Sequence, residues 1–136
     1  RNAEFVRYGV MHRNTFLDSP RLLDATYALK AEPRIRFAGQ MTGVEGYIES
    51  TASGWVAGVA AAMEVLGRPM PQLDRFTAVG ALASYISDHT VTKFQPMNIN
   101  FGIIEPLGYK IKGKREKNAK ISERALERIE SLKGEL

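Results

Sequence analysis

Three glycines lie within eight residues near the centre of the chain, directly after the short apolar run Ile35 to Ala38. They are Gly39, Gly43 and Gly46. In α/β proteins, a strand that ends in a glycine-rich turn and continues into a helix often holds the phosphates or ring oxygens of a nucleotide cofactor. Backbone N–H groups at the start of the helix, reinforced by its dipole, attract anions and electron-rich carbonyls. The segment therefore predicts a cofactor-binding turn.

Side chains of the same turn add groups that suit a flat, polar ring. Gln40 and Thr42 supply hydrogen-bonding groups, and Tyr47 offers an aromatic face for stacking. The glycines allow the backbone to approach a ligand closely. The alternative is that the glycines only form turns and that Tyr47 packs in a core. The residue types by themselves leave both interpretations open.

A second candidate site is a basic segment that precedes the last amphipathic stretch. It contains Lys110, Lys112, Lys114, Arg115, Lys117 and Lys120, against the single acid Glu116. Phosphate contacts from such residues dominate nucleic-acid affinity, and the net charge of +4 with a pI near 9.5 permits a polyanionic partner. The alternative is a charged face that is simply solvated.

Several chemistries are absent from the composition. The chain has no cysteine, which excludes disulfides, cysteine metal sites and a thiolate nucleophile within these 136 residues. We identify no catalytic residue and no metal site, and we assign no proton-transfer role to either histidine. No apolar stretch reaches the roughly 20 residues that span a bilayer. A cytoplasmic protein of one domain's size is expected, and because Arg1 stands where an initiator Met would, we expect a fragment of something longer.

The elements that must position these residues follow from the apolar pattern. We expect strands near residues 5–11, 26–29 and 35–38, a helical turn that Ser19 caps, and a helix over 49–66. Thr77 should cap a helix whose buried positions include Leu82 and Ile86, and a last helix should span 116–133. Phe94 to Gly102 is expected to be an ordered loop. Gly54 and Gly58 inside the helix over 49–66 suggest a close neighbour, a sheet or a cofactor.

Longer motifs resemble one family throughout the chain. Phe37-Ala38-Gly39-Gln40 with Thr42-Gly43-Val44-Glu45-Gly46-Tyr47 resembles the last flavin-contacting segment of the tRNA-modifying flavoproteins related to glucose-inhibited division protein A. The segments 3–15, 94–98, 100–102 and 123–126 resemble the folate-dependent tRNA (uracil-5-)-methyltransferase branch of that family. Val44-Glu45 also favours this branch over the sister branch, which builds carboxymethylaminomethyl groups on wobble uridine.

The resemblance implies an α/β fold, the carboxy-terminal part of a Rossmann-like FAD-binding flavoprotein, with residues 1–67 in the FAD-binding domain and 68–136 in a helical tail region. It implies FAD as the cofactor, reduced by NADH or NADPH, and methylenetetrahydrofolate as the donor of a methyl group to carbon 5 of a T-loop uridine in tRNA. The expected cofactor-binding residues are Gly39, Gln40, Thr42, Gly43, Val44, Glu45, Gly46 and Tyr47. The expected tRNA-binding residues are Arg13 and the six basic residues from Lys110 to Lys120.

The resemblance also implies that parts are missing. The Gly-rich dinucleotide fingerprint and the reactive cysteines of the family do not occur in these residues, so we expect the isolated chain to be inactive. We expect an amino-terminal part of the same polypeptide as a partner, and self-association where that part leaves an apolar surface uncovered. The rival hypotheses are the sister wobble-uridine enzyme and a non-catalytic RNA-binding module.

Overall fold

A computed structural model of the chain describes residues 2, 4 and 15–135. The strand predicted over 5–11 and the side chain of Arg13 lie outside these residues. The elements are α1 (Ser19–Leu22), β1 (Ala28–Leu29), β2 (Glu32–Arg36), a short 3₁₀ helix (Gln40–Thr42), α2 (Tyr47–Val65), α3 (Ala78–Ser87) and α4 (Lys114–Lys133). The fold is a mixture of helices with a small sheet, which confirms the α/β class. The Rossmann-like detail stays a prediction.

The two strands form an antiparallel hairpin with residues 30 and 31 at its tip. Its boundaries differ from the predicted strands, because β2 begins at Glu32 and contains Pro33, which was expected to separate the strands. A proline is tolerated there because a two-stranded sheet consists only of edge strands, where an N–H group need not pair. Tyr27, immediately before β1, has a φ of 62° and is buried. Its carbonyl accepts the N–H of Phe37 at 3.0 Å.

The α1 segment corrects one predicted cap. Ser19 is the first helical residue, and the N-cap position belongs to Asp18. The hydroxyl of Ser19 instead donates to the carbonyl of Thr42 at 2.8 Å, in the interior of the protein. The local sequence pattern predicted that Ser19 caps the helix, but its hydroxyl is used in a hydrogen bond to a distant segment instead. The proline in the first turn is as predicted.

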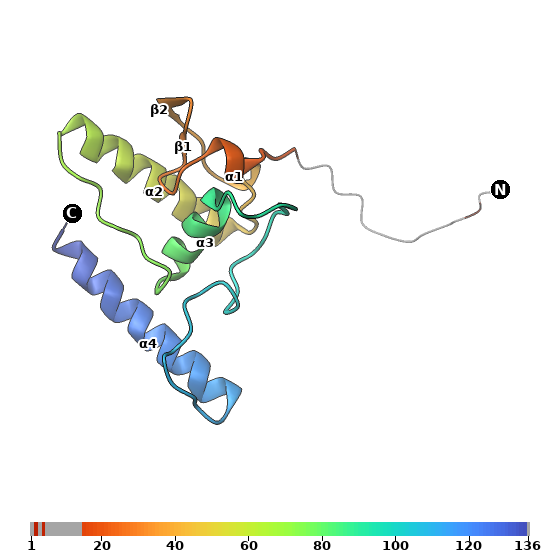
Figure 1. The fold of residues 1–136 in the computed structure, drawn as a ribbon, viewed down its shortest axis with the longest axis vertical. Coiled ribbons are helices and arrows are strands. Elements are labelled where there is room, and N and C mark those ends of the chain that lie inside the picture. Colours follow the sequence, from red (N-terminus) through yellow and green to blue (C-terminus); the bar gives the residue numbers. More distant parts are fainter. Residues whose placement is uncertain (1, 3, 5–14, 136) are drawn as a thin grey trace.

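Helices α2 and α3 make the main core with α1 (Figure 1). Thr77 caps α3 as predicted, because its Oγ1 accepts the N–H of Gly80 at 3.0 Å. The core is formed by Leu23, Tyr27, Val44, Val56, Ala57, Leu82, Ala83, Ile86 and Phe94. It thus joins residues from both sides of residue 67, and the proposed division of the chain there stays a prediction.

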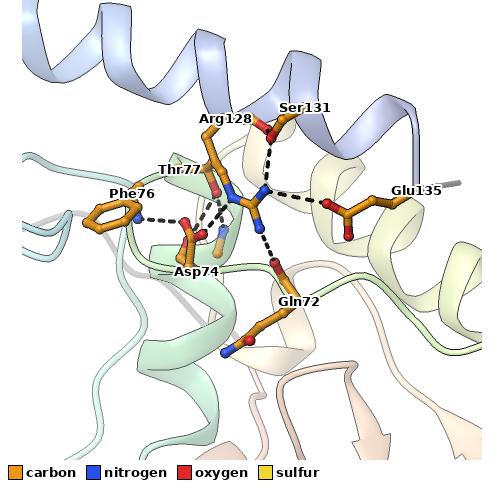
Figure 2. A network of polar contacts seen from close by, with 8 residues as sticks. Gln72, Asp74, Phe76, Thr77, Arg128, Ser131 and Glu135 are labelled. Carbon is orange, nitrogen blue, oxygen red and sulfur yellow. Dashed lines mark hydrogen bonds and ion pairs between the residues drawn. The ribbon is translucent and has the colours of Figure 1, made fainter.

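Helix α4 lies along one side of this core in Figure 1 and is anchored at its middle and end. Ile121 is buried against Ala81 and Ile104, and Leu132 is buried near the carboxyl end. The guanidinium of Arg128 binds Asp74, the carbonyl of Gln72 and the hydroxyl of Ser131, as Figure 2 shows. The described part of the chain contains no helix with the length and apolar character needed to cross a membrane.

Candidate functional site

The glycine-rich turn has a backbone that side-chain-bearing residues rarely adopt. Gly39, Gly43 and Gly46 have φ values of 74°, 87° and 92°. Such values cost an L-residue roughly 1–2 kcal/mol, and glycine escapes this cost because it lacks a Cβ. The three glycines frame the 3₁₀ helix and the start of α2. The sequence pattern of strand, turn and helix is therefore present in the structure.

Two serines fix the turn to its neighbours. The N–H of Gly39 donates to Ser53 Oγ at 2.7 Å, and that hydroxyl donates to the carbonyl of Ser50. On the other side, Ser19 holds the carbonyl of Thr42, and the hydroxyl of Thr42 donates to the carbonyl of Gly39 at 2.7 Å. These hydrogen bonds tie the turn to α1 and α2.

The loop from Phe94 to Gly102 packs directly on the turn. Val44 and Met97 form a parallel bridge, in which Met97 N–H donates to the Gly43 carbonyl and Glu45 N–H donates to the Met97 carbonyl, both at 3.0 Å. A Cβ added to Gly43 would lie 2.3 Å from Cζ of Phe94. The loop is ordered as predicted, and its contact with the turn is the part that sequence reasoning missed. The one sequence signal for this contact was that both segments carry motifs that resemble the same family.

The loop also meets the start of α2. The N–H of Ile99 donates to Glu49 Oε1 at 3.2 Å. A Cβ on Gly46 would lie 2.2 Å from Glu49 Oε2 and 2.9 Å from the amide nitrogen of Asn98. Gly46 therefore marks the point where turn, loop and helix converge. Glu49 and Asn98 were not among the predicted site residues.

The predicted cofactor-binding residues divide into two groups. Thr42, Gly43 and Val44 are buried in the protein, and the N–H groups of Gly39, Thr42, Gly43 and Glu45 donate to protein acceptors. Gln40 and Gly46 are exposed, and the side chain of Tyr47 is 94% exposed. The buried residues can shape the turn, and the exposed residues are the ones that can contact a ligand.

The start of α2 supplies the free polar groups of this surface. No side chain caps the helix at Gly46. The first N–H groups of a helix have no partner within it, and they carry the positive end of its dipole. An anion or an electron-rich ring carbonyl can accept from these groups while a flat ring lies against Tyr47.

The basic segment is exposed along its length. Lys110 and Lys112 precede α4, whereas Lys114, Arg115, Lys117 and Lys120 lie on its first turns. Among the described residues, the ion pair recorded for this segment joins Lys120 to Glu123 at 2.6 Å. That hydrogen bond raises the pKa of Lys120. Lys110, Lys112 and Lys117 line one pocket, and Lys114 and Lys117 line another. Arg13 lies outside the described residues.

Together these features define an α/β protein with a glycine-rich turn between a strand and a helix and with a separate basic surface. The sequence model of the family described as "Glucose inhibited division protein A" matches residues 1–69, about half of the 136 residues. The chain belongs to this family.

Curated relatives match nearly the whole chain. A protein of Acetivibrio thermocellus is 60% identical over 125 residues, which is 92% of this chain and 29% of the relative. Proteins of Desulfitobacterium hafniense and Bacillus subtilis are 54% and 53% identical over 97% and 96% of the chain, and each is covered to 30%. All three are named methylenetetrahydrofolate–tRNA-(uracil-5-)-methyltransferase TrmFO. The chain spans about 30% of the length of these relatives.

Proposed function

We propose that this chain forms the carboxy-terminal part of a flavoenzyme that transfers a methyl group from methylenetetrahydrofolate to carbon 5 of a T-loop uridine in tRNA. The main support for this proposal is that the chain is 53–60% identical, over 92–97% of its length, to proteins named for this reaction. The proposal includes FAD as the cofactor, reduced by NADH or NADPH. Since the substrate is tRNA, the activity belongs in the cytoplasm.

The residues of the turn fit a bound flavin. The side chains of Glu49 and Asn98 fill the space where a Cβ of Gly46 would lie, so glycine lets the turn, the loop and the start of α2 meet there. Next to it, α2 begins without a side-chain cap, and Tyr47 is almost fully exposed. Hydrogen-bond donors and a stacking face thus lie together on one open surface. When bound, FAD would supply the redox chemistry that reduces the transferred one-carbon group.

In this proposal each predicted residue has a definite task. Gly43 and Val44 hold the turn against the loop from Phe94 to Gly102. Thr42 closes the turn on Gly39 and is bonded by Ser19, and Gly39 holds the turn against α2. Gln40, Glu45, Gly46 and Tyr47 face the cofactor side. The N–H groups at the start of α2 stabilise negative charge on the ring.

The rest of the relatives' polypeptide would supply what this chain lacks. The chain has no cysteine, so a cysteine nucleophile must come from that part. Helix α2 and its C-cap residue Leu66 expose four large apolar side chains, those of Ile48, Trp55, Val65 and Leu66. On the same helix, a Cβ at Gly58 would meet no atom within 4 Å. We propose that the remaining polypeptide packs on this face, which accounts for glycines inside the helix.

The experiment is a chimera. The segment of the Bacillus subtilis relative that matches this chain is replaced by the 136 residues, and the purified protein is assayed for flavin absorbance and for transfer of a labelled methyl group to tRNA. We expect a bound flavin and methylated tRNA. A folded chimera that takes up neither flavin nor label would contradict the proposal.

A matched pair of variants tests the role of the turn within the chimera. Gly46→Ala places a Cβ against Glu49 and Asn98, whereas Gly67→Ala has open space although its φ of 65° is also positive. Both changes carry the same kind of backbone cost. Only Gly46→Ala should lower the flavin content. Equal flavin content in the two variants would show that Gly46 does not contribute to flavin binding.

A further inference from the structure

A groove runs between the end of the loop at Phe94 to Gly102 and the amino-terminal half of α4. It consists of two adjoining cavities of about 730 and 400 Å³, which share Ile99, Asn100 and Phe101 in their walls. The larger cavity is also lined by Gly102, Ile111, Gly113, Lys114, Lys117 and Asn118. The groove is distinct from the turn at residues 39–47.

One half of the groove is apolar and has an exposed aromatic ring. Ile104 and Ile121 are buried beneath it, while the ring of Phe101 is 45% exposed and Leu126 is 68% exposed. The amide of Asn100 is bonded within the loop, because its Oδ1 accepts the N–H of Gly102 at 2.9 Å and its Nδ2 donates to the Asn98 carbonyl. Asn100 thereby holds the loop that presents Phe101.

The other half of the groove is cationic. Lys114 and Lys117 lie on the first turns of α4 and are exposed, with the amide of Asn118 beside them. Among the described residues that line the two cavities, none is acidic. Cations at the amino end of a helix oppose its dipole, so these lysines reduce the stability of the free chain. An anion placed between them would offset this repulsion.

We propose that this groove binds one unpaired nucleotide of an RNA, with the base on Phe101 and the phosphate between Lys114 and Lys117. The inference rests on the proposed action on tRNA and adds a site for that substrate. An acidic peptide would satisfy the lysines and leave the apolar half empty, whereas a nucleotide uses both halves. Base stacking on an aromatic side chain is a principal source of affinity for single-stranded nucleic acid.

The position of the groove relates it to the turn. The loop that carries Phe101 also carries Met97 and Asn98, which contact the turn and the start of α2. Arg124 holds α4 against the chain on its other side, because its Nη1 donates to the carbonyl of Pro106 at 3.1 Å and its guanidinium lies 4.6 Å from the centre of the Phe76 ring. One ordered loop thus connects the RNA groove with the proposed flavin surface.

The test measures binding of a fluorescent RNA hairpin with an unpaired loop to the 136-residue chain, by anisotropy over a series of salt concentrations. Phe101→Ala should weaken binding roughly 5- to 150-fold with an unchanged salt slope. Phe101→Tyr should restore it. Trp55→Ala is the matched control, since Trp55 is also 45% exposed but lies on α2. It should bind like the wild-type chain.

The lysines are tested in the same assay. Lys114→Ala combined with Lys117→Ala should reduce the slope of log affinity against log salt by roughly 1.4, as for two lost contacts with a single strand. Lys93→Ala combined with Arg34→Ala removes the same charge elsewhere and should have a smaller effect. Circular dichroism of each variant confirms that it is folded.

The outcomes separate this inference from the proposed function. A wild-type chain that binds RNA while Phe101→Ala and Trp55→Ala behave alike would overturn the groove and leave the methyl-transfer proposal standing. A polyglutamate peptide that binds the groove as well as RNA, insensitive to Phe101→Ala, would assign it to acidic protein segments instead. A wild-type chain without RNA affinity would also overturn it. RNA binding that depends on Phe101, together with an inactive chimera, would support the nucleotide-binding groove and contradict the methyl-transfer proposal.

Discussion

Arg128 and Asp74, which are 54 residues apart in the chain, form a hydrogen-bonded ion pair with 2.7 Å between Nε and Oδ2. The pair joins α4 to the segment that leads into α3, and both side chains are only 27% exposed. The N–H of Phe76 donates to the other carboxylate oxygen of Asp74 (Figure 2). Asp74 thus ties the start of α3 and the last helix together, and the hydrogen bond to Asp74 raises the pKa of Arg128.

We expect Arg128→Ala to lower the melting temperature measured by circular dichroism, because it leaves Asp74 and the carbonyl of Gln72 without their partner. The control is Arg34→Ala, which breaks an ion pair with Glu32 in which the arginine is 82% exposed. Surface pairs of that kind contribute little. Equal changes in the two variants would show that Arg128 does not anchor α4.

Gly43→Ala should reduce the free energy of unfolding by at least about 1–2 kcal/mol, the cost of a positive φ for an L-residue. The contact of the new Cβ with the Phe94 ring adds an overpacking cost of about 1–3 kcal/mol. Gly58→Ala is the matched control: it lies in a helix with open space around it and should stabilise the chain by roughly 0.5–1 kcal/mol. Urea unfolding measures both. A Gly43→Ala chain as stable as the wild type would contradict the packing of the loop on the turn.

Tyr27 should make the chain sensitive to alkaline pH. Burial raises the pKa of the Tyr27 phenol above its ordinary value of 10.0. The unfolded chain therefore releases this proton near pH 10, whereas the folded chain keeps it. The stabilisation is fully present below pH 10 and is lost as pH rises from there through the folded pKa.

Tyr27→Phe should remove this part of the pH dependence, measured as the free energy of unfolding at several alkaline pH values. Tyr109→Phe, in which the replaced side chain is exposed, should keep it. If both variants lose stability at high pH as steeply as the wild type, Tyr27 is not the group responsible.

The basic segment, which includes Lys114 of the groove, should contribute to tRNA binding by the chimera. Lys112→Ala, Lys114→Ala and Arg115→Ala combined should reduce the slope of log affinity against log salt by roughly 2–3, from 0.7–0.9 per lost contact. Flavin affinity should not change, since these residues lie away from the turn. Arg21, Arg34 and Lys93 changed together to alanine provide the same loss of charge. An unaltered salt slope would identify the segment as a solvated face.

The apolar face of α2 should cause self-association when the rest of the polypeptide is absent. We expect the sedimentation coefficient of the 136-residue chain to rise with concentration. Val65→Lys with Leu66→Lys should lower this association, while Leu126→Lys, which alters a similarly exposed leucine outside α2, should not. A strictly monomeric wild-type chain at high concentration would count against the uncovered face.

Much of the local structure followed from residue types alone. Thr77 predicted the start of α3, and the buried positions Leu82 and Ile86 followed from helical spacing. The predicted helices over 49–66 and 116–133 differ from α2 and α4 by at most two residues at either end. Caps and apolar periodicity act over a few residues, so the sequence displays them directly.

Other features depended on contacts between distant segments. Ser19 does not cap the helix as predicted, because its hydroxyl donates to the carbonyl of Thr42. Pro33 lies in a strand because both strands of the hairpin are edge strands. The sequence by itself determined the glycine-rich turn, the basic segment and the family. Only the tertiary structure decided that Phe94 fills the space beside Gly43, that Asn98 meets Gly46, and that Phe101 shares a groove with Lys114 and Lys117. Each of these pairs is separated by many residues, and residue types carry no information about which distant side chains packing will bring together.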